Sequence, residues 1–144
     1  DGHSMDDTLH NGERLFVSVL DVRLSGVERG DVVICHYPGR GDTNFVKRVV
    51  GVPGDTLMFV DNVLIRNGEV VDEPYLTPSR NQNGFSMLPI TLGENEYFVC
   101  GDNRDNSHDC RNLTNGVPEA ITRDMIIGHV RYVVYPFSDA RSIN

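Results

Sequence analysis

The sequence predicts a mostly antiparallel β fold: a folded-over sheet with a small β-rich insertion, built as one domain over residues 1–144. Three observations predict it. The apolar residues fall in short runs rich in valine, isoleucine, phenylalanine and tyrosine, each bounded by glycine, proline, asparagine or aspartate. The length of 144 residues suits one domain. The 39% hydrophobic and 24% charged content is that of a globular chain, which excludes disorder and collagen-like repeats.

The predicted strands follow one another at short intervals along the chain. They span residues 14–20, 31–37, 45–50, 56–60, 63–66, 96–100 and 128–135. Two tight hairpin turns are predicted, at Asp61-Asn62 and at Asn67-Gly68, because asparagine and glycine tolerate positive φ. A meander of short antiparallel strands follows from this spacing.

Two segments do not fit the strand pattern. A short helix is expected to start after Pro118 and to run through Glu119 and Ala120 to Ile121. The insertion is expected at about residues 61–95, with a polar, loop-rich middle over residues 77–84.

The charge balance excludes some classes of partner, and the count of basic residues points to a single lysine. The net charge is −8, from 21 acidic and 13 basic residues, which argues against a nucleic-acid partner and against charge-driven binding to anionic lipid. Twelve of the basic residues are arginine, and Lys47 is the only lysine. A buried lysine can lose its proton near neutral pH, whereas arginine cannot. Lys47 is therefore the candidate for a general base.

Metal-site signatures are missing from the sequence. The five histidines show no HExxH spacing, and the three cysteines form no CxxC pair. Residues 102–109 look superficially like a calcium loop, but Arg104 stands at the third position and Ser107 at the sixth, where an oxygen ligand and glycine are needed. We expect no metal and no other cofactor.

No GxSxG or SxxK motif is present, which leaves two catalytic arrangements open. One is a Cys–His pair, for which no local signature exists, and the other is a Ser–Lys pair with Lys47 as its base. Strand alternation puts Lys47 on one face with its apolar neighbours at positions 45 and 49, where burial would lower its pKa. The alternative is a lysine that extends its stem from an edge strand to water. Two similar segments offer the serine, at Ser4-Met5 and at Ser86-Met87, and the residues alone do not decide between them.

Four segments occur in a familiar order. They read GHSMDDTL at residues 2–9, RGDVV at 29–33, FVKRVVGVPGD at 45–55 and GDNRDNSHDCR at 101–111. Together they resemble the bacterial type I signal peptidases, which are Ser–Lys endopeptidases that remove signal peptides from exported preproteins through an acyl-enzyme. In that family the serine segment precedes the lysine, so the resemblance selects Ser4 over Ser86.

The resemblance also implies roles for individual residues. Ser4 would be the nucleophile, Lys47 the general base, and Ser107 a hydrogen-bond partner of the lysine. An ion-paired scaffold under the site would comprise Asp102, Arg104, Asp109 and Arg111. An extended substrate with small residues at the first and third positions before the cut would lie against Gly2, Met5, Leu9, Asp42, Phe45 and Val46. Asp7 stands where the family usually has proline, and its carboxylate is expected near the lysine.

Two other functions remain open: a self-cleaving Ser–Lys protease of the SOS-repressor type, and a signal-peptidase-like assembly module without catalysis. The resemblance also implies a membrane anchor upstream of Ser4 and a catalytic domain outside the cytoplasm. The chain begins at Asp1 and holds no apolar run near the ~18–20 residues of a membrane span. We therefore expect that such an anchor has been trimmed. The expected partners are the signal peptides of preproteins and the membrane, with no nucleic acid.

Overall fold

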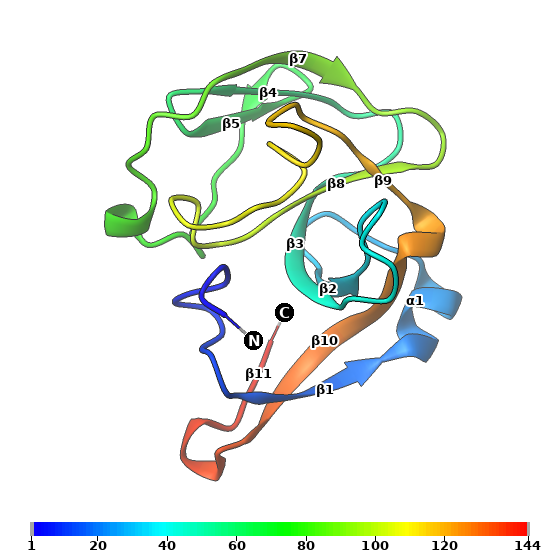
Figure 1. Cartoon of the computed structure of the whole chain (residues 1–144), viewed down its shortest axis with the longest axis vertical. Coiled ribbons are helices and arrows are strands. Elements are labelled where there is room, and N and C mark those ends of the chain that lie inside the picture. Colours follow the sequence, from blue (N-terminus) through cyan, green and yellow to red (C-terminus); the bar gives the residue numbers. More distant parts are fainter. Residues whose placement is uncertain (1, 144) are drawn as a thin grey trace.

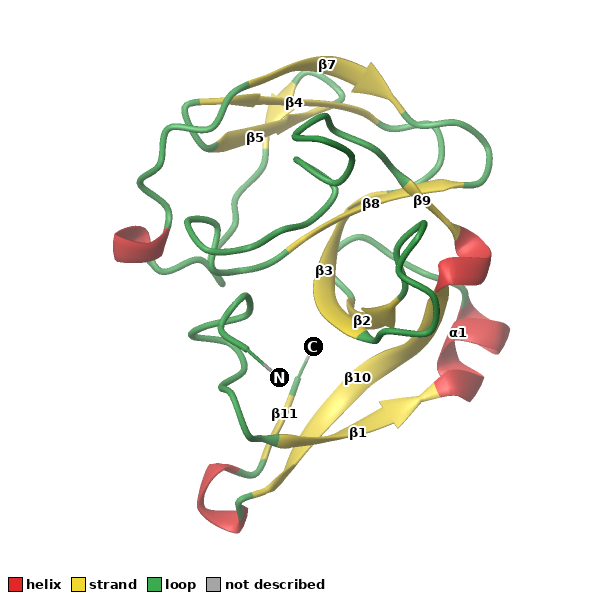
Figure 2. Ribbon diagram, viewed as in Figure 1, coloured by secondary structure: helices red, strands yellow, loops and turns green. Residues whose placement is uncertain are grey.

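The computed structural model describes residues 2–143 and contains two antiparallel sheets (Figures 1 and 2). The first sheet has the strand order β1-β10-β2-β3-β8-β9, with β11 also paired to β10, and the second has the order β6-β5-β4-β7. The expected mostly antiparallel β fold is confirmed. The elements are β1 (Arg14–Ser18), α1 (Val19–Ser25), β2 (Val32–Cys35), β3 (Phe45–Gly51), β4 (Thr56–Val60), β5 (Val63–Arg66), β6 (Glu69–Val70), η1 (Pro78–Arg80), β7 (Met87–Thr91), β8 (Glu96–Cys100), β9 (Ile121–Thr122), η2 (Arg123–Met125), β10 (Ile126–Tyr135), η3 (Phe137–Asp139) and β11 (Arg141–Ser142).

All seven predicted strands are present, but the first two are shorter than expected. Strand β2 covers only Val32–Cys35 of the predicted residues 31–37. Strand β1 ends at Ser18, and helix α1 takes over at Val19, so the strand prediction was wrong for residues 19–20. The Ser18 side chain accepts a hydrogen bond from the backbone N–H of Asp21 and so caps the helix. A serine followed three residues later by an acidic residue is a helix-start pattern, which the apolar run concealed.

The short helix expected after Pro118 is absent. Residues 118–120 form no regular element, Ile121–Thr122 form β9 against β8, and the single turn η2 follows. Ile121 is fully buried in this pairing. Burial of a β-branched side chain against a neighbouring strand outweighs the weak local preference for a helix start.

The two predicted hairpin turns are confirmed. Asp61 and Asn62 have φ of 47° and 69°, and Asn67 and Gly68 have φ of 53° and 83°. Positive φ at both central residues matches the type I′ turns that connect twisted strands. The turns join β4 to β5 and β5 to β6, so the second sheet spans residues 56–91, including strand β7, which was not predicted.

The N-terminal segment is anchored by its own small core. Met5 and Leu9 are buried together with side chains of β2, β10 and the C-terminal segment: Val32, Val130, Val133 and Ile143. In Figure 1 this segment, drawn in blue, lies between the yellow loop after β8 and strand β11. Burial of Met5 fixes the position of the neighbouring Ser4. Among residues 2–143, no helix is long and apolar enough to cross a bilayer.

Candidate active site

Strand β3 holds Lys47 in the interior of the larger sheet. β3 pairs with β2 on one side and β8 on the other, and Lys47 lies opposite Val33. Only 4% of Lys47 is exposed, and Val33 and Val49, which share its face, are fully buried. A lysine that reaches water from an edge strand is therefore the wrong interpretation.

Ser4 approaches Lys47 from the N-terminal segment, with 2.7 Å between Ser4 Oγ and Lys47 Nζ. The backbone N–H of Asn103 donates to the Ser4 carbonyl at 2.8 Å, and the Asn103 side-chain amide donates to the His3 carbonyl at 3.0 Å. Residues from three distant parts of the chain thus meet at one point. The predicted pairing of Ser4 with Lys47 exists as a contact.

Burial determines the charge state of the lysine. It lowers the pKa of Lys47 because the charged amine loses its hydration, while the Asp109 carboxylate pulls the pKa in the opposite direction. The net shift is downward, which raises the fraction of neutral amine at a given pH. A neutral amine within hydrogen-bond distance of a hydroxyl can accept its proton.

Ser107 does not make the expected hydrogen bond with Lys47. Its hydroxyl is buried near the Asp109 carboxylate and has no partner of normal geometry among residues 2–143. The Ser107 side chain packs instead against Gly101, where an added Cβ would collide with it and with the Ser4 carbonyl. Ser107 thus borders the Ser4–Lys47 pair without bonding to the amine.

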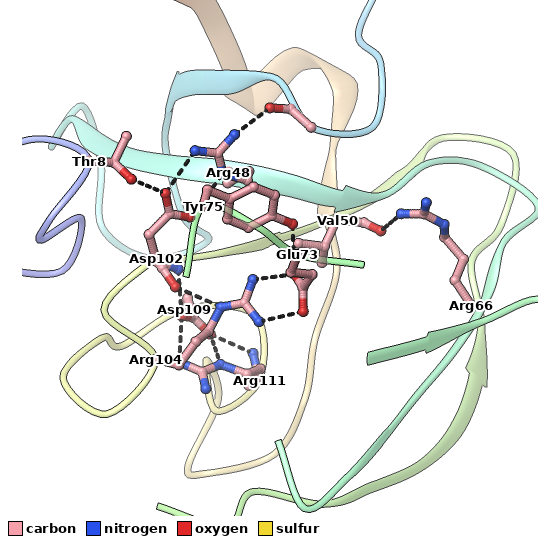
Figure 3. Close-up of polar contacts among 12 residues, drawn as sticks. Thr8, Arg48, Val50, Arg66, Glu73, Tyr75, Asp102, Arg104, Asp109 and Arg111 are labelled. Atoms are coloured by element: carbon pink, nitrogen blue, oxygen red, sulfur yellow. Dashed lines mark hydrogen bonds and ion pairs between the residues drawn. The ribbon is translucent and has the colours of Figure 1, made fainter. Parts of the chain in front are cut away.

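The four predicted scaffold residues are all buried and ion-paired (Figure 3). Asp109 pairs with Arg111 through two contacts of 2.9 Å. The other two use partners outside the predicted set. Asp102 accepts from Arg48 at 2.9 and 2.8 Å, and Arg104 donates to Glu73 at 2.7 and 3.3 Å.

Sequence reasoning missed Arg48, Glu73, Tyr75 and Thr8, which complete this scaffold. The Arg48 guanidinium lies 3.8 Å from the centre of the Tyr75 ring, and the Tyr75 hydroxyl donates to Glu73 at 2.7 Å (Figure 3). The Thr8 hydroxyl donates to Asp102. A signal for Arg48 was available, because an arginine within an apolar strand is rarely buried without a partner.

One cavity beside the Ser4–Lys47 pair contains most of the predicted substrate contacts. Gly2, Met5, Leu9, Phe45 and Val46 line it together with Ser4 and Lys47. Asp42 does not line the cavity and lies in the exposed turn before β3. The sequence did not indicate the remaining lining residues, which are His10, Asn11, Gly12, Glu13, Leu15 and Asn44.

Asp7 and Ser86 both lie away from the lysine. Asp7 makes no contact with Lys47, contrary to expectation, and its carboxylate accepts hydrogen bonds from Thr77 at 2.9 Å and Arg80 at 3.1 Å. The Ser86 hydroxyl accepts from the backbone N–H of Asp61 at the β4–β5 turn. Ser86 is thus part of the second sheet's hairpin and has no lysine beside it.

Comparisons with known proteins agree with this geometry. The family described as signal peptidase, peptidase S26, matches residues 1–135. The chain is 40% identical over 152 residues to signal peptidase I S of Bacillus subtilis (strain 168), covering 100% of this chain and 79% of that protein. It is 34% identical over 153 residues to signal peptidase IB of Staphylococcus aureus (strain N315), covering 96% and 76%. The crystal structure of a signal peptidase I from Enterococcus faecalis V583 superposes with a TM-score of 0.57 at 26% identity, covering 72% of this chain and 95% of that chain.

Proposed function

Because the chain belongs to the signal peptidase family, peptidase S26, whose members are serine endopeptidases that cleave signal peptides, we propose that Ser4 and Lys47 are its catalytic dyad. The observation that carries the proposal is the 2.7 Å contact between Ser4 Oγ and a lysine amine that is 4% exposed. Both features are needed for a lysine general base, since the amine must be neutral and must reach the hydroxyl proton.

The proposed reaction has two stages. Neutral Lys47 accepts the Ser4 hydroxyl proton while Oγ attacks the scissile carbonyl, and the backbone N–H of Ser4 stabilises the resulting oxyanion. Lys47 then protonates the leaving amine, which releases the mature protein and leaves an ester on Ser4. A water molecule deprotonated by Lys47 hydrolyses this ester and restores the serine.

The cavity beside the dyad supports a preference for small side chains. Met5, Leu9, Phe45 and Val46 give it an apolar wall close to Ser4. We propose that the signal peptide binds extended beside residues 42–45, with small residues at the first and third positions before the cut. We place the reaction at the outer face of the cell membrane, where preproteins emerge.

The test is incubation of the protein with a preprotein and with the same preprotein altered at its cleavage site. We expect cleavage by the unmodified chain and a loss of roughly 10³-fold or more in Ser4→Ala and Lys47→Arg. Lys47→Arg keeps a cation on a long stem but cannot supply a neutral base. Ser86→Ala is the matched control, and its activity should be unchanged.

The result also separates the alternatives. Normal cleavage by Lys47→Arg would refute the dyad. Cleavage of this chain alone, with no action on the preprotein, would identify a self-cleaving protease. Inertness of every variant, including the unmodified chain, would favour an assembly module.

A further inference from the structure

Asp7 connects the serine-bearing segment to a part of the chain seventy residues away. It follows Ser4 by three positions, and its carboxylate accepts one hydrogen bond from the Thr77 hydroxyl at 2.9 Å and one from Arg80 Nε at 3.1 Å. Its side chain is 44% exposed. The contact therefore contributes little to the core, and its effect must lie in the placement of the segment that carries it.

Arg80 has more than one partner on that segment. Its Nη1 lies 4.0 Å from the Asp6 carboxylate, in addition to the contact with Asp7. Asp6 is flanked by His3 at 3.1 Å and His10 at 3.6 Å. Arg80 is thus the cation placed between two adjacent carboxylates, and its removal would leave these repelling each other.

The segment that carries Arg80 is itself fixed at its other end. The Asp105 N–H donates to the Arg80 carbonyl at 3.1 Å, and the Asp105 carboxylate accepts from the backbone N–H groups of Gln82 at 2.7 Å and Asn83 at 2.9 Å. Residues 77–83 are therefore attached to the same loop that holds Ser4 through Asn103. A closed ring of contacts results, and Asp7 with Arg80 forms its exposed link.

We propose that Asp7, Thr77 and Arg80 form a clasp through which the insertion sets the position of Ser4 Oγ relative to Lys47. These three are positioning residues, since none touches the reacting atoms. The proposal rests on the proposed dyad. A clasp of this kind acts on kcat, because a displaced nucleophile binds substrate normally but reacts more slowly.

The first test is kinetic. At low ionic strength we expect kcat to fall about three- to fivefold in Arg80→Ala and somewhat less in Asp7→Asn, with KM changed less than twofold, as suits an exposed ion pair. Charge reversal in the double variant Asp7→Arg with Arg80→Asp should recover part of the loss, because it restores the pair between positions 7 and 80 but not the contact with Asp6. Near 1 M salt, where screening acts over about 3 Å, the difference between Arg80→Ala and the unmodified chain should shrink.

Two control variants separate the positioning effect of the clasp from a general effect of changing the charge of the protein. Asp72→Asn makes the same charge change within the same insertion, and Arg23→Ala removes another exposed arginine. Both should leave kcat unchanged. Equal losses in the controls would overturn the clasp.

The second test does not need activity. In a Ser4→Ala background, hydrogen exchange of the backbone amides of residues 4–9 should become faster in Arg80→Ala, while exchange in β3 and β8 stays the same. Faster exchange throughout the molecule would indicate a general loss of stability and would overturn the proposal. Unchanged exchange at residues 4–9, or faster exchange there with unchanged kcat, would overturn it equally. Failure of the unmodified chain to cleave any preprotein would instead count against the dyad and leave the exchange result valid for the clasp.

Discussion

The ion pair between Glu73 and Arg104 is the clearest test of how the insertion supports the site. The side chains are 6% and 1% exposed, and the guanidinium donates to the carboxylate at 2.7 and 3.3 Å. The Tyr75 hydroxyl donates to the same carboxylate. Glu73→Gln retains the shape but leaves the buried Arg104 cation without its counter-charge.

The expected cost follows from that burial. Removing one partner of a buried pair costs about 3–5 kcal/mol, because the remaining charge stays desolvated. For a chain of this size, 1 kcal/mol shifts Tm by roughly 3 °C, so the shift should be about 9–15 °C. In the unmodified chain burial favours the neutral form of Arg104, but neighbours that include the Glu73 carboxylate outweigh it and leave the pKa raised. Without Glu73 the guanidinium still keeps its proton at neutral pH, as arginine does even when buried, so deprotonation does not relieve the cost.

Urea unfolding at pH 7 with circular dichroism measures the change, and Glu69→Gln is the control. Glu69 is exposed on β6 of the same insertion, and its substitution should change the free energy of unfolding by less than about 0.5 kcal/mol. The double variant Glu73→Met with Arg104→Met should lose less than the sum of its two single variants. A cost below about 1 kcal/mol in Glu73→Gln, with an unchanged m value, would refute the importance of this buried pair.

Three further results are expected. Gly101→Ala should lower kcat by about 10²-fold, because its Cβ would displace the Ser4 carbonyl, and near-normal turnover in a folded variant would contradict the packing seen here. Labelling with ¹³C-lysine gives a single side-chain NMR signal, because Lys47 is the only lysine. The titration midpoint of this signal should lie below the usual lysine pKa of about 10.4, and kcat/KM should rise over the same pH range. A midpoint at or above that value would exclude a neutral base. Burial raises the pKa of Asp55, but Arg29 and neighbouring hydrogen bonds outweigh this and bring it to about 2. Asp55→Asn should therefore cost about 2 kcal/mol at pH 7. Its difference from the unmodified chain should shrink as the pH falls from about 4 to 2, where about half of the Asp55 side chains are still ionised, and should be lost below about pH 2. An undiminished difference at pH 2 would contradict that pairing.

The parts of the fold that local patterns control were predictable. Asn67-Gly68 lies in a short-range pattern with one favoured turn geometry, and β3 is a short segment rich in valine whose identity as a strand can be recognised without its partners. The two-residue strand at Ile121 was not predictable, because it exists only through pairing with β8. The start of helix α1 was predicted as strand because Val19 and Leu20 continue the apolar run of β1, so that the local pattern itself was misleading.

In the candidate site, too, the residues that local patterns mark were predictable, and those that depend on tertiary contacts were not. Lys47 could be singled out from composition and alternation, and Ser4 through the order of segments. The partners of the scaffold could not be foreseen, because which carboxylate faces which guanidinium depends on how β3, the loop after β8 and the insertion come together. Asp102 and Arg104 are two positions apart, yet the first pairs with Arg48 and the second with Glu73.

These pairings change the interpretation of the insertion. A loop-rich segment would be dispensable for chemistry if its contacts stayed within its own sheet. Here Glu73 holds a buried arginine of the loop that also positions Ser4, and Tyr75 covers Arg48, the neighbour of Lys47 in β3. Arg80 reaches the serine segment directly. Residues 73–80 therefore belong to the active-site structure. The β5–β6 hairpin at Asn67-Gly68 instead contacts the start of β4, because the Asn67 side chain donates to Asp55 at 3.0 Å and accepts from the Thr56 N–H at 2.9 Å. Changes in that hairpin should therefore affect stability more than catalysis.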